Sequence, residues 1–135
     1  MNIEPSELSG AIASILEDVS YEIKERVDKA GSEAAEDGAG ELKQTSPKYT
    51  GSRKLQYRPG AYARSWRVKS IRSSITGNSV HTIYNDHHYR LTHLLEFGHV
   101  NRDGTRAKKI VHIEPVNRRV CKEFERKVEE ILNDL

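Results

Sequence analysis

The sequence contains few of the residues that cross-link a chain or build a metal cluster. Its 135 residues include one cysteine, Cys121, which excludes an internal disulfide and a zinc site made of several thiolates. Cys121 lies near Phe124 and Val128 on a predicted helix, so we expect it to be a small packing residue. Cofactor-binding and metal-binding motifs are also lacking, and we predict no cofactor.

Large aromatic residues and long apolar runs are also scarce. Two Phe and one Trp are the largest anchors available, so we expect a thin core that would be stabilised by contact with neighbouring subunits. No apolar run approaches the roughly 18 residues of a membrane span, and the start lacks the features of a secretory signal. We therefore expect a single domain, residues 1–135, that is made in the cytoplasm and does not contact membranes.

Carboxylates are missing from the middle of the chain. Residues 1–41 carry 11 acidic and 3 basic side chains, whereas residues 42–85 carry 9 basic and no acidic ones. Residues 86–135 are balanced, with 10 basic and 9 acidic side chains. The overall charge of +2 thus hides a strong segregation, and we expect the folded domain to have an acidic pole and a basic pole.

Apolar residues at steps of three and four predict helices at both ends of the chain. The first is expected from about Pro5 to about Ala35, with fraying through residues 37–40 before Ser46-Pro47 ends it. The last is expected to begin at Pro115, because proline suits a first helical position. A short helix is predicted around residues 89–95, capped by Asp86 and ended by Gly98.

Between the helices the sequence predicts strands and two loops. Residues 61–71 and 80–84 alternate around a turn at residues 76–79, which indicates an antiparallel hairpin, and residues 110–113 indicate a short third strand. Residues 45–60 and 99–109 are predicted to be mobile, basic loops. The predicted fold is α+β: a long N-terminal helix, a small antiparallel sheet, a short helix and a C-terminal helix, with the helices packed on one face of the sheet.

An ordered series of motifs resembles a family of phage assembly proteins. The series is Ser46-Pro47-x-x-Thr50-Gly51, then Tyr62-Ala63-Arg64-Ser65-Trp66, then Leu95-Glu96-Phe97-Gly98-His99, then His112-Ile113-x-Pro115. In this order and spacing it is similar to the tail-completion, or head-tail joining, family of long-tailed bacteriophages. The resemblance covers residues 42–135 by motif and the first helix by position. An insertion at residues 54–60 departs from the family pattern.

The resemblance implies a structural protein of the virion neck, and not an enzyme. It implies a ring, hexameric in the assembled virion, that binds other neck and tail proteins after assembly in the bacterial host cytoplasm. Transient contact with genomic DNA is a further expectation. The structural motif residues that the resemblance implies are Pro47, Gly51, Trp66, Glu96, Gly98 and Pro115.

Cations on the loops and the hairpin are the predicted contact residues. They would meet the acidic helix of an adjacent subunit or touch DNA phosphates, and we favour the adjacent subunit because gripping phosphates would hinder DNA passage. The predicted partner interface consists of Lys48, Arg53, Lys54, Arg58, Arg64, Arg67, Arg102, Arg106, Lys108 and Lys109.

Two other functions use the same residues. An endoribonuclease would need Glu96 with His93 or His99 as base and acid, although a structural carboxylate that binds backbone amides at a turn is the favoured interpretation of Glu96. A nucleic-acid-binding module would stack bases on Tyr62 and Trp66, although we favour packing roles for both rings. The chain has six histidines, but their spacing argues against a metal site.

Overall fold

The structure is a computed structural model that describes residues 5–48 and 60–135. Its helices are α1 (Pro5–Thr45), α2 (Ala61–Arg64), α3 (Tyr89–Phe97) and α4 (Ile113–Asn133). Its strands are β1 (Trp66–Arg72), β2 (Ser79–Asn85), β3 (His99–Val100) and β4 (Arg106–Ala107). The predicted α+β class is confirmed.

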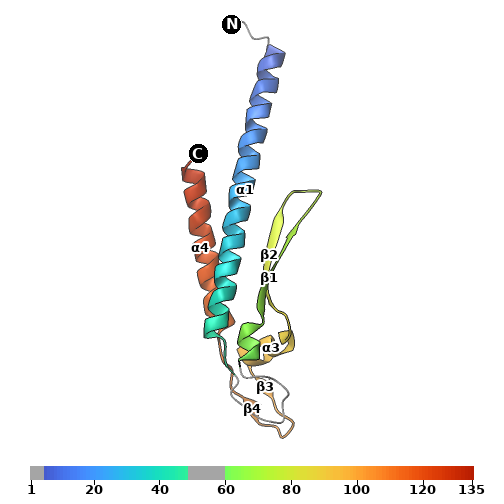
Figure 1. The fold of residues 1–135 in the computed structure, drawn as a ribbon, viewed down its shortest axis with the longest axis vertical. Helices are drawn as coiled ribbons and strands as arrows, with labels where there is room; N and C mark the ends of the chain where they lie inside the picture. The colour runs from blue at the N-terminus through green and yellow to red at the C-terminus, as the bar shows by residue number, and fades with distance from the viewer. Residues whose placement is uncertain (1–4, 49–59) are drawn as a thin grey trace.

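Helix α1 is the central element of the molecule. Helix α4 packs along one side of its C-terminal half, and the β1–β2 hairpin packs along another (Figure 1). The short helices α2 and α3 lie at the base of the hairpin, and the β3–β4 hairpin lies beyond them at the end of the molecule. The N-terminal half of α1 extends past both of its neighbours (Figure 1).

The β1–β2 hairpin has one face toward α1 and one face toward solvent. Its antiparallel register runs from Trp66 opposite Asn85 to Arg72 opposite Ser79. Along β2, partly buried residues alternate with exposed ones until Asn85, as expected of a strand with one covered face. The covered face includes Ile83, which packs against the core.

The core lies at the base of the molecule, where α1 ends and α4 begins. Its buried cluster is Leu42, Tyr62, Trp66 and Val116. The Trp66 indole meets the Tyr62 ring edge-on at 5.7 Å between ring centroids, and its Nε1 donates a hydrogen bond of 2.8 Å to Ser46 Oγ. This cluster agrees with the predicted packing of both rings. Because Tyr62 and Trp66 are both buried, neither ring is free to stack on a base.

The first helix is longer than predicted, because α1 continues through residues 37–40 to Thr45. Gly38 is buried at the point where α4 and the hairpin come closest to α1. A Cβ there would lie 2.7 Å from Val120 Cγ2 and 2.8 Å from Ile83 Cδ1. Close packing on both sides therefore keeps this glycine-containing segment helical despite its low propensity. The predicted end at Ser46-Pro47 is correct.

One predicted strand begins later than expected, and another is wrong. Residues 61–64 form α2 rather than the start of a strand, because a helical turn after Gly60 places the neighbours Tyr62 and Ala63 both in the core. Residues 110–113 form no strand, because their amides bond to the end of α3 instead: the Ile110 N–H donates to the Leu95 carbonyl at 2.7 Å.

The predicted cap of helix α3 is also wrong. Asp86 is not its N-cap, because the helix begins at Tyr89 and His88 occupies the capping position. The turn before α3 is instead held by Asn85, whose Oδ1 accepts a hydrogen bond of 2.8 Å from the His88 N–H.

The predicted loop at residues 99–109 has regular structure, whereas most of the predicted loop at residues 45–60 lies outside the described residues. Strands β3 and β4 pair antiparallel, with His99 opposite Ala107 and Val100 opposite Arg106. Gly98, which ends α3 as predicted, has a φ of 76°. A Cβ at Gly98 would lie 2.7 Å from the Ala107 carbonyl oxygen, so this position requires glycine on two grounds.

Two helical glycines provide a matched test of the packing around α1. We expect Gly38→Ala to lower the free energy of unfolding by about 1 kcal/mol, because overpacking outweighs the gain in helix propensity. A Cβ added at Gly40 would have nothing within 4 Å, so Gly40→Ala is expected to raise the same free energy by about 0.5 kcal/mol or more. Urea denaturation followed by circular dichroism measures both. A stabilising Gly38→Ala would contradict the close packing.

Candidate assembly surfaces

Glu96 binds the start of helix α4. Its carboxylate accepts hydrogen bonds from the backbone N–H groups of His112, Ile113 and Glu114 at 2.9, 3.0 and 3.0 Å. The first amides of a helix have no partner within the helix, and a carboxylate there also interacts well with the helix dipole. Glu96 thus joins α3 to α4, and these contacts agree with a structural carboxylate.

A buried histidine and tyrosine complete this junction. His112 Nδ1 lies 2.8 Å from the Ile110 carbonyl oxygen and donates to it, and Nε2 lies 2.8 Å from the Tyr62 hydroxyl, from which the neutral ring accepts. Burial, and then the charge of Glu96, raises the pKa of Tyr62 above its ordinary value. The tyrosine therefore stays a neutral donor. All three side chains are buried, and each has a partner within the junction.

The protonation of Glu96 fits a structural role. Burial alone would favour the neutral acid, but the hydrogen bonds from His112, Ile113 and Glu114 outweigh it and hold the pKa of Glu96 below its ordinary value. An acid catalyst that works near neutral pH needs the opposite shift. His93, which the endoribonuclease hypothesis pairs with Glu96, is exposed and stacks on Phe97.

We expect Glu96→Gln to lower the free energy of unfolding by about 2 kcal/mol at pH 7, because an amide accepts less well from three N–H groups. Since the pKa of Glu96 is lower in the folded chain, its contribution is complete above the unfolded-state pKa of about 4.3 and is lost as pH falls through the folded-state value. The deficit of the variant should therefore shrink below about pH 4.

Denaturant titration between pH 3 and pH 7 measures this difference. Glu125→Gln is the matched control, since Glu125 is exposed on α4 and should change stability by less than about 0.5 kcal/mol. A Glu96→Gln variant as stable as the control would exclude the carboxylate as the link between α3 and α4.

The predicted interface cations that the structure describes are all exposed, and they lie on several elements. Arg64 and Arg67 lie at the base of the β1–β2 hairpin, whereas four others lie in or next to the β3–β4 hairpin (Figure 1). The exposed cations are Lys48, Arg64, Arg67, Arg102, Arg106, Lys108 and Lys109. The predicted residues Gly51, Arg53, Lys54 and Arg58 lie outside the described residues. Pro47 is half-buried, and Pro115 is exposed in the first turn of α4.

The turn between β3 and β4 contains one acidic residue, Asp103, which binds within the turn and forms no salt bridge with the nearby cations of the described chain. Asp103 Oδ1 accepts from the Thr105 hydroxyl at 2.6 Å and from its backbone N–H at 2.9 Å, and these bonds lower the pKa of Asp103. Within residues 5–48 and 60–135, no salt bridge reaches the four cations nearby, which are Arg102, Arg106, Lys108 and Lys109. This end of the molecule is therefore a basic surface.

The acidic pole is only partly separate from the basic one. In the C-terminal half of α1, acids pair with neighbours in the same chain: Glu25 with Arg72 at 2.5 Å, and Asp28 with His81 at 2.9 Å. Glu33 and Glu41 pair with Lys127 and Arg119 of α4. The predicted separation of acidic from basic residues is therefore restricted to the N-terminal half of α1.

The N-terminal half of α1 has an apolar stripe without a neighbour in the described chain. We call residues 5–22 the projecting segment, because α4 ends beside Arg26, which pairs with Asp134 at 3.0 Å, and the hairpin reaches Glu25. Ile12, Ile15, Leu16 and Val19 follow at helical spacing and are 50, 60, 63 and 39% exposed. Sequence periodicity identifies this stripe as one face of a helix, but it does not show that the face lacks a neighbour.

The solvent face of the β1–β2 hairpin is a second open surface. We call it the outer face, and it consists of Arg67, Lys69, Ile71, Val80, Thr82 and Tyr84, which are all exposed. Its apolar members Ile71, Val80 and Tyr84 are 57, 63 and 38% exposed. The face contains two cations and no acid. Of these residues, the sequence predicts only Arg67 as an interface residue, because strand alternation alone does not tell which face is left open.

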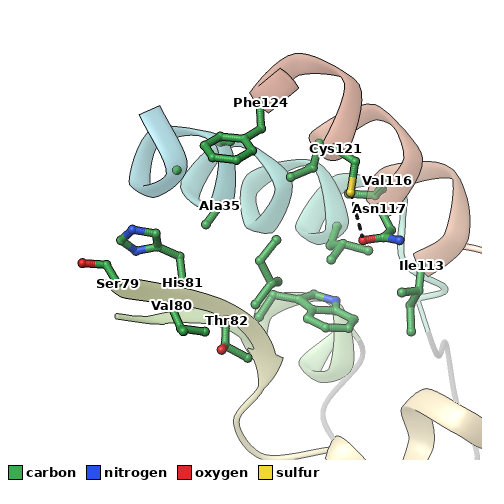
Figure 2. Close-up of a pocket in the computed structure, with 16 residues that line it drawn as sticks. Ala35, Ser79, Val80, His81, Thr82, Ile113, Val116, Asn117, Cys121 and Phe124 are labelled. Carbon is green, nitrogen blue, oxygen red and sulfur yellow. Dashed lines mark hydrogen bonds between the residues drawn. The ribbon is translucent and has the colours of Figure 1, made fainter. Parts of the chain in front are cut away.

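A groove of about 560 Å³ runs between the hairpin and α4, with α1 as its floor (Figure 2). Ala34 and Ala35 belong to the floor, and Val116 and Val120 belong to the α4 wall. Cys121 also lines it and is exposed, so the predicted packing role of this cysteine is wrong. The walls are mostly apolar, and their one titratable ring, His81, already bonds to Asp28 and Ser70.

The described part of the chain shows neither a cluster suited to a metal ion nor a helix suited to a membrane. No group of three or more His, Cys, Asp or Glu residues there is placed to hold a metal ion. Among the same residues, no helix is long and apolar enough to cross a membrane. Two of the open surfaces, the stripe of the projecting segment and the outer face, combine exposed apolar side chains with charges, and such patches are typical of a subunit of a larger assembly.

Comparison with known proteins agrees with this class. A family model described as "Bacteriophage HK97-gp10, putative tail-component" matches residues 11–98. The chain therefore belongs to the HK97-gp10-like family of bacteriophage tail components, and the family expected from the sequence motifs is confirmed. The match begins at Ala11 within α1, includes the β1–β2 hairpin and ends at Gly98. No curated protein and no solved structure matches the chain.

Proposed function

We propose that this tail component is a ring-forming subunit of the phage neck, which completes the tail end or joins head to tail. The observation that carries the proposal is the projecting segment. Most helical stability in proteins comes from packing of an apolar face, and the projecting segment has no such packing within the described chain. Its exposed stripe is therefore expected to be covered in the assembled particle by another subunit.

The charges favour contact between proteins over a DNA grip. The outer face combines its cations with exposed Ile71 and Val80, which phosphate binding does not need. The base-stacking alternative loses its platform because Tyr62 and Trp66 are buried. The cations around the β3–β4 turn remain available for neighbouring proteins or for transient contact with DNA.

A non-enzymatic role is part of the proposal. The one buried carboxylate in the predicted site, Glu96, is occupied by three backbone amides, and its pKa is shifted away from that of an acid catalyst. We propose that the chain needs no cofactor and acts in the virion after assembly in the host cytoplasm.

Loss of the gene product tests the proposal. A phage with a nonsense codon in this gene should produce filled heads and tails that remain separate, or tails without a terminal ring, because the joint lacks its subunit. Electron microscopy of the lysate measures the fraction of joined particles, and wild-type chain supplied from a plasmid should restore joining. A phage without the chain that forms normally joined, infectious particles would exclude the neck role.

A further inference from the structure

We propose that the projecting segment of one copy docks on the outer face of the β1–β2 hairpin of the next copy. This inference rests on the proposed ring and specifies the contact that closes it. The two surfaces belong to different parts of the chain, so the contact is heterologous, which is the type that generates rings.

Charge complementarity favours the projecting segment as the partner of the outer face. The projecting segment contains Glu7, Glu17, Asp18 and Glu22 and no Lys or Arg. Asp18 and Glu22 follow Ile15 and Val19 by three residues, so they lie along one side of the apolar stripe. Within residues 5–48 and 60–135, no salt bridge reaches Glu17, Asp18 or Glu22.

The outer face offers the opposite charge beside an apolar pair. Arg67 and Lys69 follow each other on β1, and Ile71 and Val80 face each other across the ladder at its far end. Docking would bury the apolar stripe of the projecting segment against Ile71 and Val80, and it would pair the carboxylates beside the stripe with the cations beside this apolar pair. The ammonium of Lys69 and the guanidinium of Arg67 would then meet Asp18 and Glu22.

The dimensions of the two surfaces agree. Residues 5–22 span roughly 27 Å at 1.5 Å per helical residue. Strands β1 and β2 have 7 residues each and span about 24 Å. By contrast, pairing two projecting segments with each other would bring like charges together along their whole length, because neither contains a cation.

Two charge-reversal variants test the contact. The segment variant carries Asp18→Lys and Glu22→Lys, and the face variant carries Arg67→Glu and Lys69→Glu. Each variant alone would place like charges at every contact, so sedimentation velocity should show half-assembly only at a concentration at least roughly tenfold higher than for the wild type. An equimolar mixture should assemble into rings in which the two variants alternate. One contact then pairs the two reversed surfaces, the next pairs the two unchanged surfaces, and opposite charges meet at both.

The mixture separates a lost contact from a lost fold, since misfolded variants would not rescue each other. The control variant, Lys43→Glu with Lys122→Glu, reverses two exposed cations elsewhere on α1 and α4 and should assemble as the wild type does. If the wild type is monomeric in solution, the same variants are scored by complementation of the nonsense phage. There, only the two variants together should restore joined particles.

Two outcomes would overturn the docking. In one, each variant assembles or complements as well as the wild type; in the other, both variants keep the circular dichroism spectrum of the wild type, yet both fail and the mixture fails too. Neither outcome bears on the neck role itself, because that role is decided by the phage that lacks the chain.

Discussion

The structure depends on a mismatch of length between α1 and the elements that pack on it. Helix α1 has 41 residues, whereas α4 has 21, and both α4 and the β1–β2 hairpin end beside Glu25 and Arg26. The amphipathic face of α1 nevertheless continues beyond that point through Val19 and Ile12. Burial of such side chains contributes roughly 1.5–3 kcal/mol each, so an open stripe leaves a substantial stabilisation available to a partner.

Below that point, the fold is held by a compact polar and aromatic junction. Glu96 ties the end of α3 to the first amides of α4, and His112 joins this contact to Tyr62 in the core. The junction also fixes the base of the β1–β2 hairpin, because the Asn85 amide donates to the Tyr62 carbonyl. The open surfaces are thereby presented from a rigid base, which is a requirement for specific assembly.

Much of the fold was predictable from local patterns, and the failures have identifiable causes. Helical periodicity located α1, α3 and α4, and alternation located the β1–β2 hairpin. The fraying predicted for residues 37–40 of α1 was wrong because packing against Val120 and Ile83 stabilises this glycine-containing turn. Residues 110–113 were misjudged because Leu95 and Glu96 take the hydrogen bonds that a strand would have used. The open surfaces could not be predicted, since periodicity marks an apolar face but not the length of its partner.

The central claim is that the N-terminal half of α1 completes its packing only in the assembled particle. Amide hydrogen exchange of residues 7–22 tests it most directly, because exchange reports the local stability of a helix. We predict fast exchange in the free chain and strong protection of the same amides in assembled tails, with the core residues around Trp66 protected in both. Equal exchange of residues 7–22 in the two states would contradict the claim.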